Sequence, residues 1–275
     1  MVSQSSSRRI AAVSTTLQVF AVAVVLLIPV IWMALSSLKR PGEVTRYPPT
    51  VIFDPTLANY AKLFAEVPFF EYGLNSLIVS VVSTLLGLAL ALPCAFAISW
   101  HSVSWPATIA LITRMAPGTL FVLPWFVLFS NLGMTGGYWV LILTHTVITM
   151  PLALWVLLPY FDALPRSIFE SAFVDGCRGV KCLVHIAIPL VLPGLMVAII
   201  LSFIASWNYF LFALVLGGID TKTLIVASFN FVGEGATDWG RLMAAAVLIC
   251  LPPLVLIFIM QRGLISGLSG GSVKG

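Results

Sequence analysis

The chain has 275 residues, of which 60% are hydrophobic and only 9% are charged, and its mean hydropathy is +1.08. A soluble domain of this length has too little interior to bury so much apolar surface, so the composition excludes a soluble globular protein and indicates a lipid bilayer. The net charge of +4 is small, and no basic cluster with interleaved aromatic residues indicates nucleic-acid binding.

Six apolar stretches are each long enough, at about twenty residues, to cross a bilayer core of about 30 Å. They predict an all-α integral membrane domain, residues 15–261, with six transmembrane helices at residues 15–37, 74–99, 107–130, 138–160, 190–216 and 241–261. The first stretch exceeds the apolar region of about 7–15 residues in a signal peptide, so we expect a retained span. Packed membrane helices tolerate the prolines inside these stretches, which are Pro29, Pro93, Pro124, Pro151, Pro252 and Pro253.

A short amphipathic helix is predicted in the polar loop between the fourth and fifth stretches. Pro165 suits its first turn, and Gly176 can end it in a left-handed conformation. One face is apolar and consists of Ile168, Phe169, Ala172 and Phe173. A helix of this kind at a membrane surface suits a groove on a partner protein.

The same loop carries a recognisable motif, Glu170-Ser-Ala-Phe-Val-Asp-Gly176, followed ten residues later by Ile186-Ala-Ile-Pro189. This spacing resembles the EAA loop of permease subunits in ATP-driven (ABC) importers. The resemblance implies that the cytoplasmic loop 161–189 contacts a separate ATPase. The residues that would couple the two proteins are Glu170, Ala172, Asp175, Gly176, Ile186 and Pro189.

Further fragments are similar to carbohydrate-importer permeases of the maltose-transporter MalG type, and together they cover nearly the whole chain. They are Ser36–Lys39, Leu57–Phe64, Asn75-Ser76, Trp207-Asn208, Trp239–Ala246 and the tail Gly267–Gly275. Ser171 stands where the family often has Ala, and Ile188 where Leu is usual, but both keep the side chain small or branched. The resemblance implies the type I ABC importer permease fold and a disaccharide or short oligosaccharide as the substrate. Glycerol 3-phosphate, or another small polar solute, is the alternative.

The resemblance also implies a set of partners in the bacterial cytoplasmic (inner) membrane. These are a second homologous permease, two ABC ATPase subunits and an extracytoplasmic sugar-binding protein. The chain itself has no P-loop, because the nearest fragment, Thr221-Lys222-Thr223, lacks the glycine before lysine. We therefore expect no catalysis and no cofactor in this chain, with ATP and magnesium used by the partner ATPase.

The orientation follows from the coupling loop, because the distribution of basic residues indicates it only weakly. With the N-terminus inside, eight basic residues lie on the cytoplasmic side and six outside. The loop must face the compartment that holds ATP, which predicts an N-in, C-in topology with cytoplasmic tails at 1–14 and 262–275.

Polar residues within the spans are candidates for the sugar path. Asn208 offers donors and an acceptor, Trp207 could stack on a sugar face, and a polar stripe is formed by Asn75, Ser80 and Thr84. The alternative is that these groups bond neighbouring helices. Outside the membrane, the loop 217–240 and the segment at Asn59-Tyr60 are expected to receive the binding protein, with contacts at Thr221 and Glu234.

Other functional classes are less well supported by the residues. A protease of the rhomboid type would need Ser269 to meet His145, but Ser269 follows the last span. A stand-alone secondary transporter would need ionisable groups deep in its spans, and Arg114 is the clear exception in a nearly uncharged interior. That arginine either reaches the cytoplasmic interface or serves as a gate or subunit contact. Cys177, Cys182 and His185 match no zinc pattern, so no metal site is expected.

Overall fold

The apolar stretches of the chain fold into helices, because lipid offers the backbone no hydrogen-bond partners and a helix satisfies its own. The computed structural model describes residues 3–232 and 237–270, with side chains described for residues 14–232 and 237–261. Within these residues the one pairing of β type is an isolated bridge between Gly136 and Gly217. The predicted all-α fold class is confirmed.

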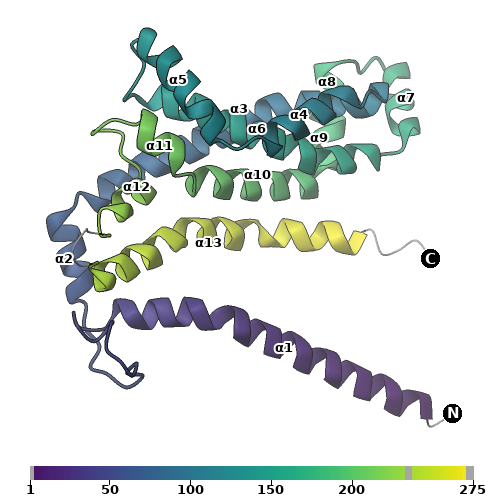
Figure 1. Ribbon diagram of the computed structural model, residues 1–275. Helices are drawn as coiled ribbons and strands as arrows, with labels where there is room; N and C mark the ends of the chain where they lie inside the picture. Colours follow the sequence, from purple (N-terminus) through teal and green to yellow (C-terminus); the bar gives the residue numbers. More distant parts are fainter. Residues whose placement is uncertain (1–2, 233–236, 271–275) are drawn as a thin grey trace. The chain divides into compact units, whose positions relative to one another are not determined.

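The helices follow one another along the chain, and the longest connection is residues 38–57, between α1 and α2 (Figure 1). Their bounds are α1 Ser3–Ser37, α2 Ala58–Glu66, α3 Phe69–His101, α4 Trp105–Met115, α5 Thr119–Asn131, α6 Tyr138–Asp162, α7 Arg166–Val174, α8 Val180–Cys182, the π-helical turn η1 Leu183–Ala187, α9 Ile188–Leu190, α10 Leu192–Trp207, α11 Leu211–Leu216, α12 Leu224–Phe229 and α13 Trp239–Gly270.

Six membrane crossings can be built from these helices. Four segments of the described chain are long and apolar enough to cross alone, namely Ser14–Ser37, Phe69–His101, Tyr138–Asp162 and Trp239–Gln261. Two bent pairs, α4 with α5 and the segment Val180–Leu190 with α10, bring the number to six when each pair is one span.

The predicted continuous span 107–130 is interrupted in the structure. Its two halves, α4 and α5, meet at an angle of 94°. The break falls at Ala116–Gly118, where Ala116 has the extended ψ of 128° that a following proline favours. Pro117 has no N–H to donate and Gly118 is a weak helix former, so the chain turns here.

The predicted span 190–216 is also not one straight helix. A bend of 87° precedes α10, at Val191. Pro193 supplies the reason, because it has no N–H for the carbonyl of Pro189 and its ring collides with that carbonyl. After Trp207 the helix stops, and α11 begins only at Leu211.

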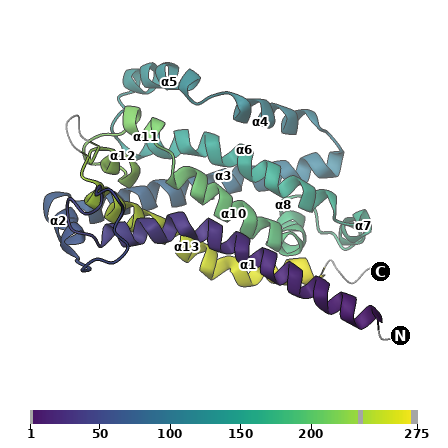
Figure 2. The same ribbon diagram turned by 60° about the horizontal axis from the view of Figure 1, so that its bottom comes forward.

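The chain divides into two compact units, residues 1–68 with 230–249 and residues 69–229 with 250–275. In the second unit α3, α6 and α10 run side by side and α4 packs on α6 (Figures 1 and 2). The short helix α7 lies at one end of this bundle, whereas α11 and α12 lie at the other.

Small residues and buried hydroxyl groups hold α3, α6 and α10 together. A Cβ atom on Gly87 of α3 would collide with Thr149 of α6, so the absence of a side chain lets these two backbones approach. The Thr149 hydroxyl donates to the carbonyl oxygen of Ser83 at 2.9 Å, and the hydroxyl oxygens of Ser83 and Ser206 are also 2.9 Å apart. On the other side of α10, Gly194 lies directly against the ring of Tyr160.

In the first unit a buried amide joins the end of α1 to α2. Asn59 is 2% exposed, and its Nδ2 donates to the carbonyl oxygens of Ser37 at 2.8 Å and Lys39 at 2.7 Å. The Tyr60 hydroxyl lies 2.8 Å from the Ser37 hydroxyl. Lys39 is itself buried, with its ammonium nitrogen 4.3 Å from the ring centroid of Trp32.

The same unit contains a cluster of ion pairs. Asp238 accepts from Lys62 at 3.2 Å and from the Arg241 side chain at 2.9 Å, and Arg241 also pairs with Glu66. Burial raises the pKa of Asp238, but the hydrogen bonds and positive charges of Arg241 and Lys62 lower it more, so its pKa falls below the usual value. The stabilisation by this carboxylate is therefore complete above the pKa of an unfolded aspartate, and it is lost as the pH falls through the lower folded value.

Replacing Asn59 by Ala should destabilise the first unit. Two buried carbonyl groups would lose their donor, which typically costs about 1–3 kcal/mol per group. We expect a lower midpoint in a thermal-unfolding measurement on the purified protein in detergent. Asn230→Ala is the matched control, because Asn230 is exposed and should unfold like the unchanged protein. Equal midpoints for both variants would contradict the role of the Asn59 amide.

Candidate functional site

The helix α7 ends as the sequence predicted. Gly176 has a φ of +80° and donates its N–H to the carbonyl of Phe173, while Cys177 donates to the carbonyl of Ala172 at 2.8 Å. These two bonds form a Schellman motif, which needs a left-handed residue after the helix. The predicted helix stop at Gly176 is confirmed, and it directs the chain sharply away from α7.

An aromatic cluster fixes α7 to the end of the bundle. Phe169 is 4% exposed, and its ring centroid lies 5.5 Å from that of Phe96 and 5.8 Å from that of Trp100, both in α3. Phe173 stands edge-on to Trp100 at 5.1 Å. Phe161, at the end of α6, contacts Phe96 at 5.9 Å. Since aromatic pairs prefer these tilted arrangements, α7 is held in a defined orientation on α3 and α6.

The apolar face of α7 is covered within this chain. The sequence predicted a helix suited to a groove on a partner protein, but Phe169 and Ala172 of its apolar face are buried here. The exposed face carries Glu170 and Asp175 instead, together with Val174. Amphipathicity shows only that one face must be covered, and here the ends of α3 and α6 cover it.

The second half of the loop forms the segment Val180–Leu190, with a π-helical turn in its middle. In that turn the N–H of Ile188 bonds the carbonyl of Leu183, five residues back. Ile186 packs against the main core of the bundle, whereas Pro189 is exposed. π-Turns often occur at functional positions in helices, and this one directly precedes the 87° bend before α10.

The predicted path residues of the fifth span differ in exposure. Asn208 is exposed at the end of α10, and its Nδ2 donates to the carbonyl of Ile204 at 3.0 Å. Trp207 is 3% exposed, and its ring stacks on Phe203 with centroids 5.6 Å apart. Trp207 is thus packed inside the chain, and only Asn208 of this pair is open to a ligand here.

The polar residues of α3 are largely engaged within the chain. Asn75 donates to the carbonyl oxygens of Asp220 at 2.8 Å and Lys222 at 3.0 Å, and it accepts from the Tyr138 hydroxyl at 2.5 Å. Ser80 donates to carbonyls of its own helix. The buried Thr84 hydroxyl has no hydrogen-bond partner among the described residues. Asn75 and Ser80 therefore use their hydrogen bonds within the chain. This agrees with the alternative prediction, in which polar groups of the spans have a structural role and do not form the sugar path.

The residues predicted to dock a binding protein are also placed. Thr221 is 4% exposed and its hydroxyl donates to the carbonyl of Gly136 at 2.9 Å, so it shapes the loop and does not form its outer surface. Its neighbour Ile219 is 89% exposed. Asn59 is buried, and Glu234 lies outside the described residues. The docking role of this set stays a prediction.

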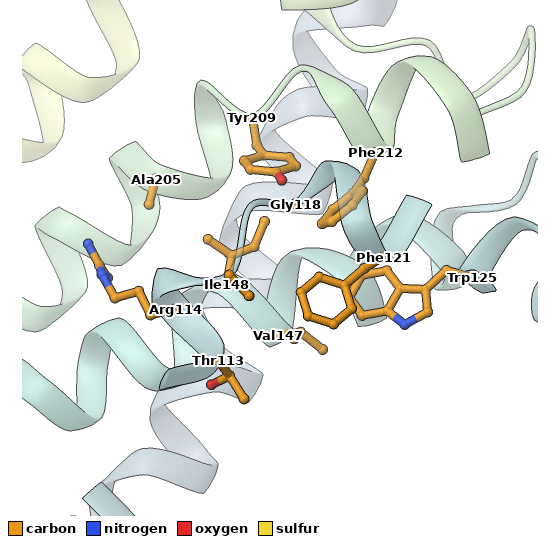
Figure 3. A pocket seen from close by; sticks show the side chains of 11 residues that line it. Thr113, Arg114, Gly118, Phe121, Trp125, Val147, Ile148, Ala205, Tyr209 and Phe212 are labelled. Atoms are coloured by element: carbon orange, nitrogen blue, oxygen red, sulfur yellow. The ribbon is translucent and has the colours of Figure 1, made fainter. Parts of the chain in front are cut away.

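A pocket of about 250 Å³ lies at the break between α4 and α5 (Figure 3). Arg114 is at one side of it, and four aromatic rings border it, those of Phe121, Trp125, Tyr209 and Phe212. Hydrophobic pattern alone does not reveal this assembly, because its four aromatic residues come from α5, from the connection between α10 and α11, and from α11 itself. The Pro117-Gly118 pair is the sequence signal that marks the break.

No metal centre is formed by the residues that the structure describes. None of their His, Cys, Asp and Glu side chains gather in groups of three or more that could hold an ion.

An apolar bundle with an exposed, rigidly mounted helix at one end is the architecture of a membrane permease subunit. The family model described as "Binding-protein-dependent transport system inner membrane component" matches residues 3–269. The chain belongs to this family of ABC importer permeases. It is accordingly a non-catalytic, multi-pass component of the inner membrane.

Individual relatives agree with this assignment. The chain is 34% identical to the probable ABC transporter permease protein y4oR of Sinorhizobium fredii, covering 99% of both chains. It is 32% identical to the trehalose/maltose transport system permease MalG of Thermococcus litoralis (92% of this chain, 93% of the relative). It is 33% identical to the sulfoquinovosyl glycerol permease SmoH of Agrobacterium fabrum, covering 90% and 89% respectively.

A solved structure shows the same fold. One chain of a bacterial ABC transporter for import of the acidic polysaccharide alginate superposes with a TM-score of 0.73 at 18% identity. The match covers 93% of this chain and 97% of the other. The predicted importer-permease fold is confirmed.

Shortening Trp100 to Ala should loosen α7 from α3. Each aromatic pair contributes about 0.5–1.5 kcal/mol beyond burial, and Trp100 makes two of them. We expect sugar uptake by the assembled transporter to fall about tenfold while the ATPase subunits still co-purify. The matched control is Trp105→Ala, which removes an exposed tryptophan from the start of α4 and should keep full uptake. Unchanged uptake in the Trp100 variant would show that transport does not depend on the attachment of α7 to α3 by the aromatic cluster.

Proposed function

We propose that this chain imports a disaccharide or short oligosaccharide, forming the translocation path with a second permease. Two ATPase subunits drive the transport, and a sugar-binding protein outside the membrane delivers the cargo. The observation that carries the proposal is the geometry of the loop 165–189. Its charged face is free, whereas its apolar face is built into the bundle by Phe169 and Ala172.

The contact with the ATPases is assigned to the exposed face of α7. Glu170 and Asp175 are both exposed, so each can meet a basic side chain of an ATPase. Gly176 lets the chain leave the docking helix without a side chain at a positive φ. Ile186 and Pro189 belong to the adjoining segment Val180–Leu190, which continues into α10 after the bend.

Transport would follow from movement of the ATPases. When they close on ATP and magnesium, they pull α7, and the aromatic cluster passes that pull to α3 and α6. The hydroxyl bonds between these helices and α10 keep the bundle together as it rocks between inward-open and outward-open states. In this scheme the chain makes and breaks no covalent bond.

The orientation supports the same assembly. The loop that carries α7 must face the cytoplasm, where ATP is present, so the N-terminus and the C-terminus are both assigned to the cytoplasm. The end of the bundle with α11, α12 and the connection at Asp220–Lys222 then faces outward. That is the side on which a binding protein approaches.

The relatives support a saccharide as cargo. Their names include trehalose and maltose, diacetylchitobiose and α-glucosides, each attributed to a different organism. Small glycosides and disaccharides are the shared chemistry of these substrates. Glycerol 3-phosphate is the cargo in the alternative hypothesis and is tested beside the sugars.

Uptake of radiolabelled sugars tests the proposal directly. Cells that produce the whole transporter are compared with cells that lack only this chain, over a panel of disaccharides, short oligosaccharides and glycerol 3-phosphate. We expect at least one saccharide to enter only when the chain is present. Glu170→Lys should abolish this uptake, since removing one partner of a desolvated charge pair typically costs about 2–5 kcal/mol.

Lys181→Gln is the control variant, because it changes a charge on the same loop but outside the motif. It should leave uptake unchanged. Uptake restricted to glycerol 3-phosphate would replace the saccharide by the alternative cargo. Normal uptake of every sugar without the chain would reject its role in import.

Asn208 is our candidate for a contact with the sugar. It is exposed at the break between α10 and α11, where a polar group in a membrane needs a partner. Asn208→Ala should lower uptake several-fold, because one hydrogen bond typically contributes about 0.5–1.5 kcal/mol. Assembly and basal ATP hydrolysis should stay intact. A variant that fails to assemble, or that transports normally, would place the sugar contacts elsewhere.

A further inference from the structure

Arg114 is a charged residue without a partner in the described part of the chain. It is the last residue but one of α4, nine residues after Trp105, which corresponds to about 14 Å along the helix. No hydrogen bond or ion pair links it to another described residue, and each ion pair of those residues lies in the first unit. Arg114 is exposed, so its charged group is free to bind a negative group from outside this chain.

The surroundings of Arg114 are those of a small-ligand site. It shares the 250 Å³ pocket with two hydroxyl-bearing residues, Thr113 and Tyr209, and with aromatic rings from α5 and α11 (Figure 3). Pockets for small molecules typically measure about 300–1,000 Å³, so this volume suits one ring and not an extended chain. The lining combines apolar faces with a few polar groups, as such sites usually do.

The aromatic walls are held in place by neighbouring residues. Tyr209 packs against Phe212 with centroids 4.7 Å apart, and Phe212 against Trp125 at 4.9 Å. The imidazole of His145 stands edge-on to the Tyr209 ring at 5.6 Å, and its Nδ1 lies 2.7 Å from the carbonyl oxygen of Leu141. The pocket is thus formed before a ligand arrives.

Gly118 lets the Tyr209 side chain pack against the start of α5. It precedes the first residue of α5, and a Cβ atom at this position would meet the Tyr209 hydroxyl and come close to Phe212. The N-terminal turn of α5 borders the pocket through Gly118 and Phe121, and the positive end of a helix dipole adds to the charge of Arg114. The local field therefore favours an anion.

The occupant must satisfy the charge and the rings together. A guanidinium group binds a carboxylate or sulfonate through paired hydrogen bonds, and aromatic faces accept the apolar face of a sugar ring. A carboxylate side chain of a neighbouring protein would use Arg114 but not the four rings. A phospholipid phosphate would likewise use Arg114 but not the four rings.

We propose that Arg114 and the aromatic pocket beside it bind an acidic ring of the transported sugar. The proposal rests on the proposed import function and narrows its cargo to saccharides that carry a carboxylate or another anionic group. Arg114 recognises the anion, Phe121 and Trp125 cover the ring, and the hydroxyls of Thr113 and Tyr209 serve the sugar oxygens.

Equilibrium binding to the assembled transporter tests this site. The complex of this chain with its second permease and ATPases is placed in phosphatidylcholine nanodiscs and titrated with radiolabelled glucuronate and glucose. These two rings differ in the carboxylate at C6. We expect the unchanged complex to bind glucuronate at least about tenfold more tightly than glucose, because charge-assisted bonds are about twice as strong as neutral ones.

Arg114→Gln should remove this preference and leave glucose binding unchanged. Arg114→Lys keeps the charge but loses the planar fork, so it should retain part of the preference. The matched control is Arg46→Gln, which removes an exposed arginine outside the pocket and should bind like the unchanged complex. Gly118→Ala should weaken glucuronate binding by displacing the Tyr209 side chain, which packs against Gly118.

Several outcomes would overturn the proposal. One is equal binding of glucuronate and glucose by the unchanged complex, and another is a full preference in Arg114→Gln. Loss of the second permease from purified Arg114→Gln would assign the arginine to a subunit contact, and loss of co-purified phosphatidylglycerol would assign it to lipid. If only this proposal fails, some sugar still enters cells in a chain-dependent way, whereas if the proposed import function fails, no sugar does.

Discussion

Close approach of helices in lipid is the constraint on which the rest of this structure depends. Lipid tails are as apolar as leucine, so burial of apolar surface does little to hold one membrane helix against another. The bundle relies on contact distance and on buried hydroxyl groups. Gly87 brings α3 onto Thr149 of α6, and Ser83 then bonds the hydroxyl of Ser206 in α10. The other segments of this unit, including α7, pack on this bundle.

The lipid environment also restricts where irregular backbone can occur. Broken helices within a membrane are tolerated where they are buried in protein or line a cavity. The break at Pro117-Gly118 lines the pocket of Arg114, and the stop after Trp207 exposes Asn208. The bend at Val191 lies between the coupling segment and α10. All three irregularities coincide with positions assigned to cargo or to coupling.

Local chemistry made some features predictable from sequence. The helix stop at Gly176 needs only a glycine after an amphipathic turn, and the spans need only apolar length. Partners in space were harder to predict. The apolar face of α7 is covered by Trp100 and Phe96, which lie about seventy residues earlier in the chain. Asn75 fits a polar stripe by spacing, yet its amide is used by the carbonyls of Asp220 and Lys222.

Helix breaks show the same limit in another way. Prolines at 93 and 151 lie inside continuous helices, and so a proline alone did not signal an interruption. At Pro117 the following Gly118 adds low helix propensity, and at Pro193 a second proline lies four residues earlier. The pocket of Arg114 depends on such a break, which is why hydrophobic pattern could place the arginine in a span but could not surround it with rings.

The helix α3 has one further consequence, because it is a single rod of 33 residues, or about 50 Å. Near its first turns, Asn75 donates a hydrogen bond to the carbonyl of Asp220, in the connection that leads to α12. The same side chain accepts a hydrogen bond from the Tyr138 hydroxyl. At its far end Trp100 holds α7. One stiff helix therefore joins the two ends of the bundle, with Pro93 as its one proline. In the proposed function the outer loops receive the binding protein and α7 meets the ATPases, so α3 would join these two sites directly, without a relay of separate helices.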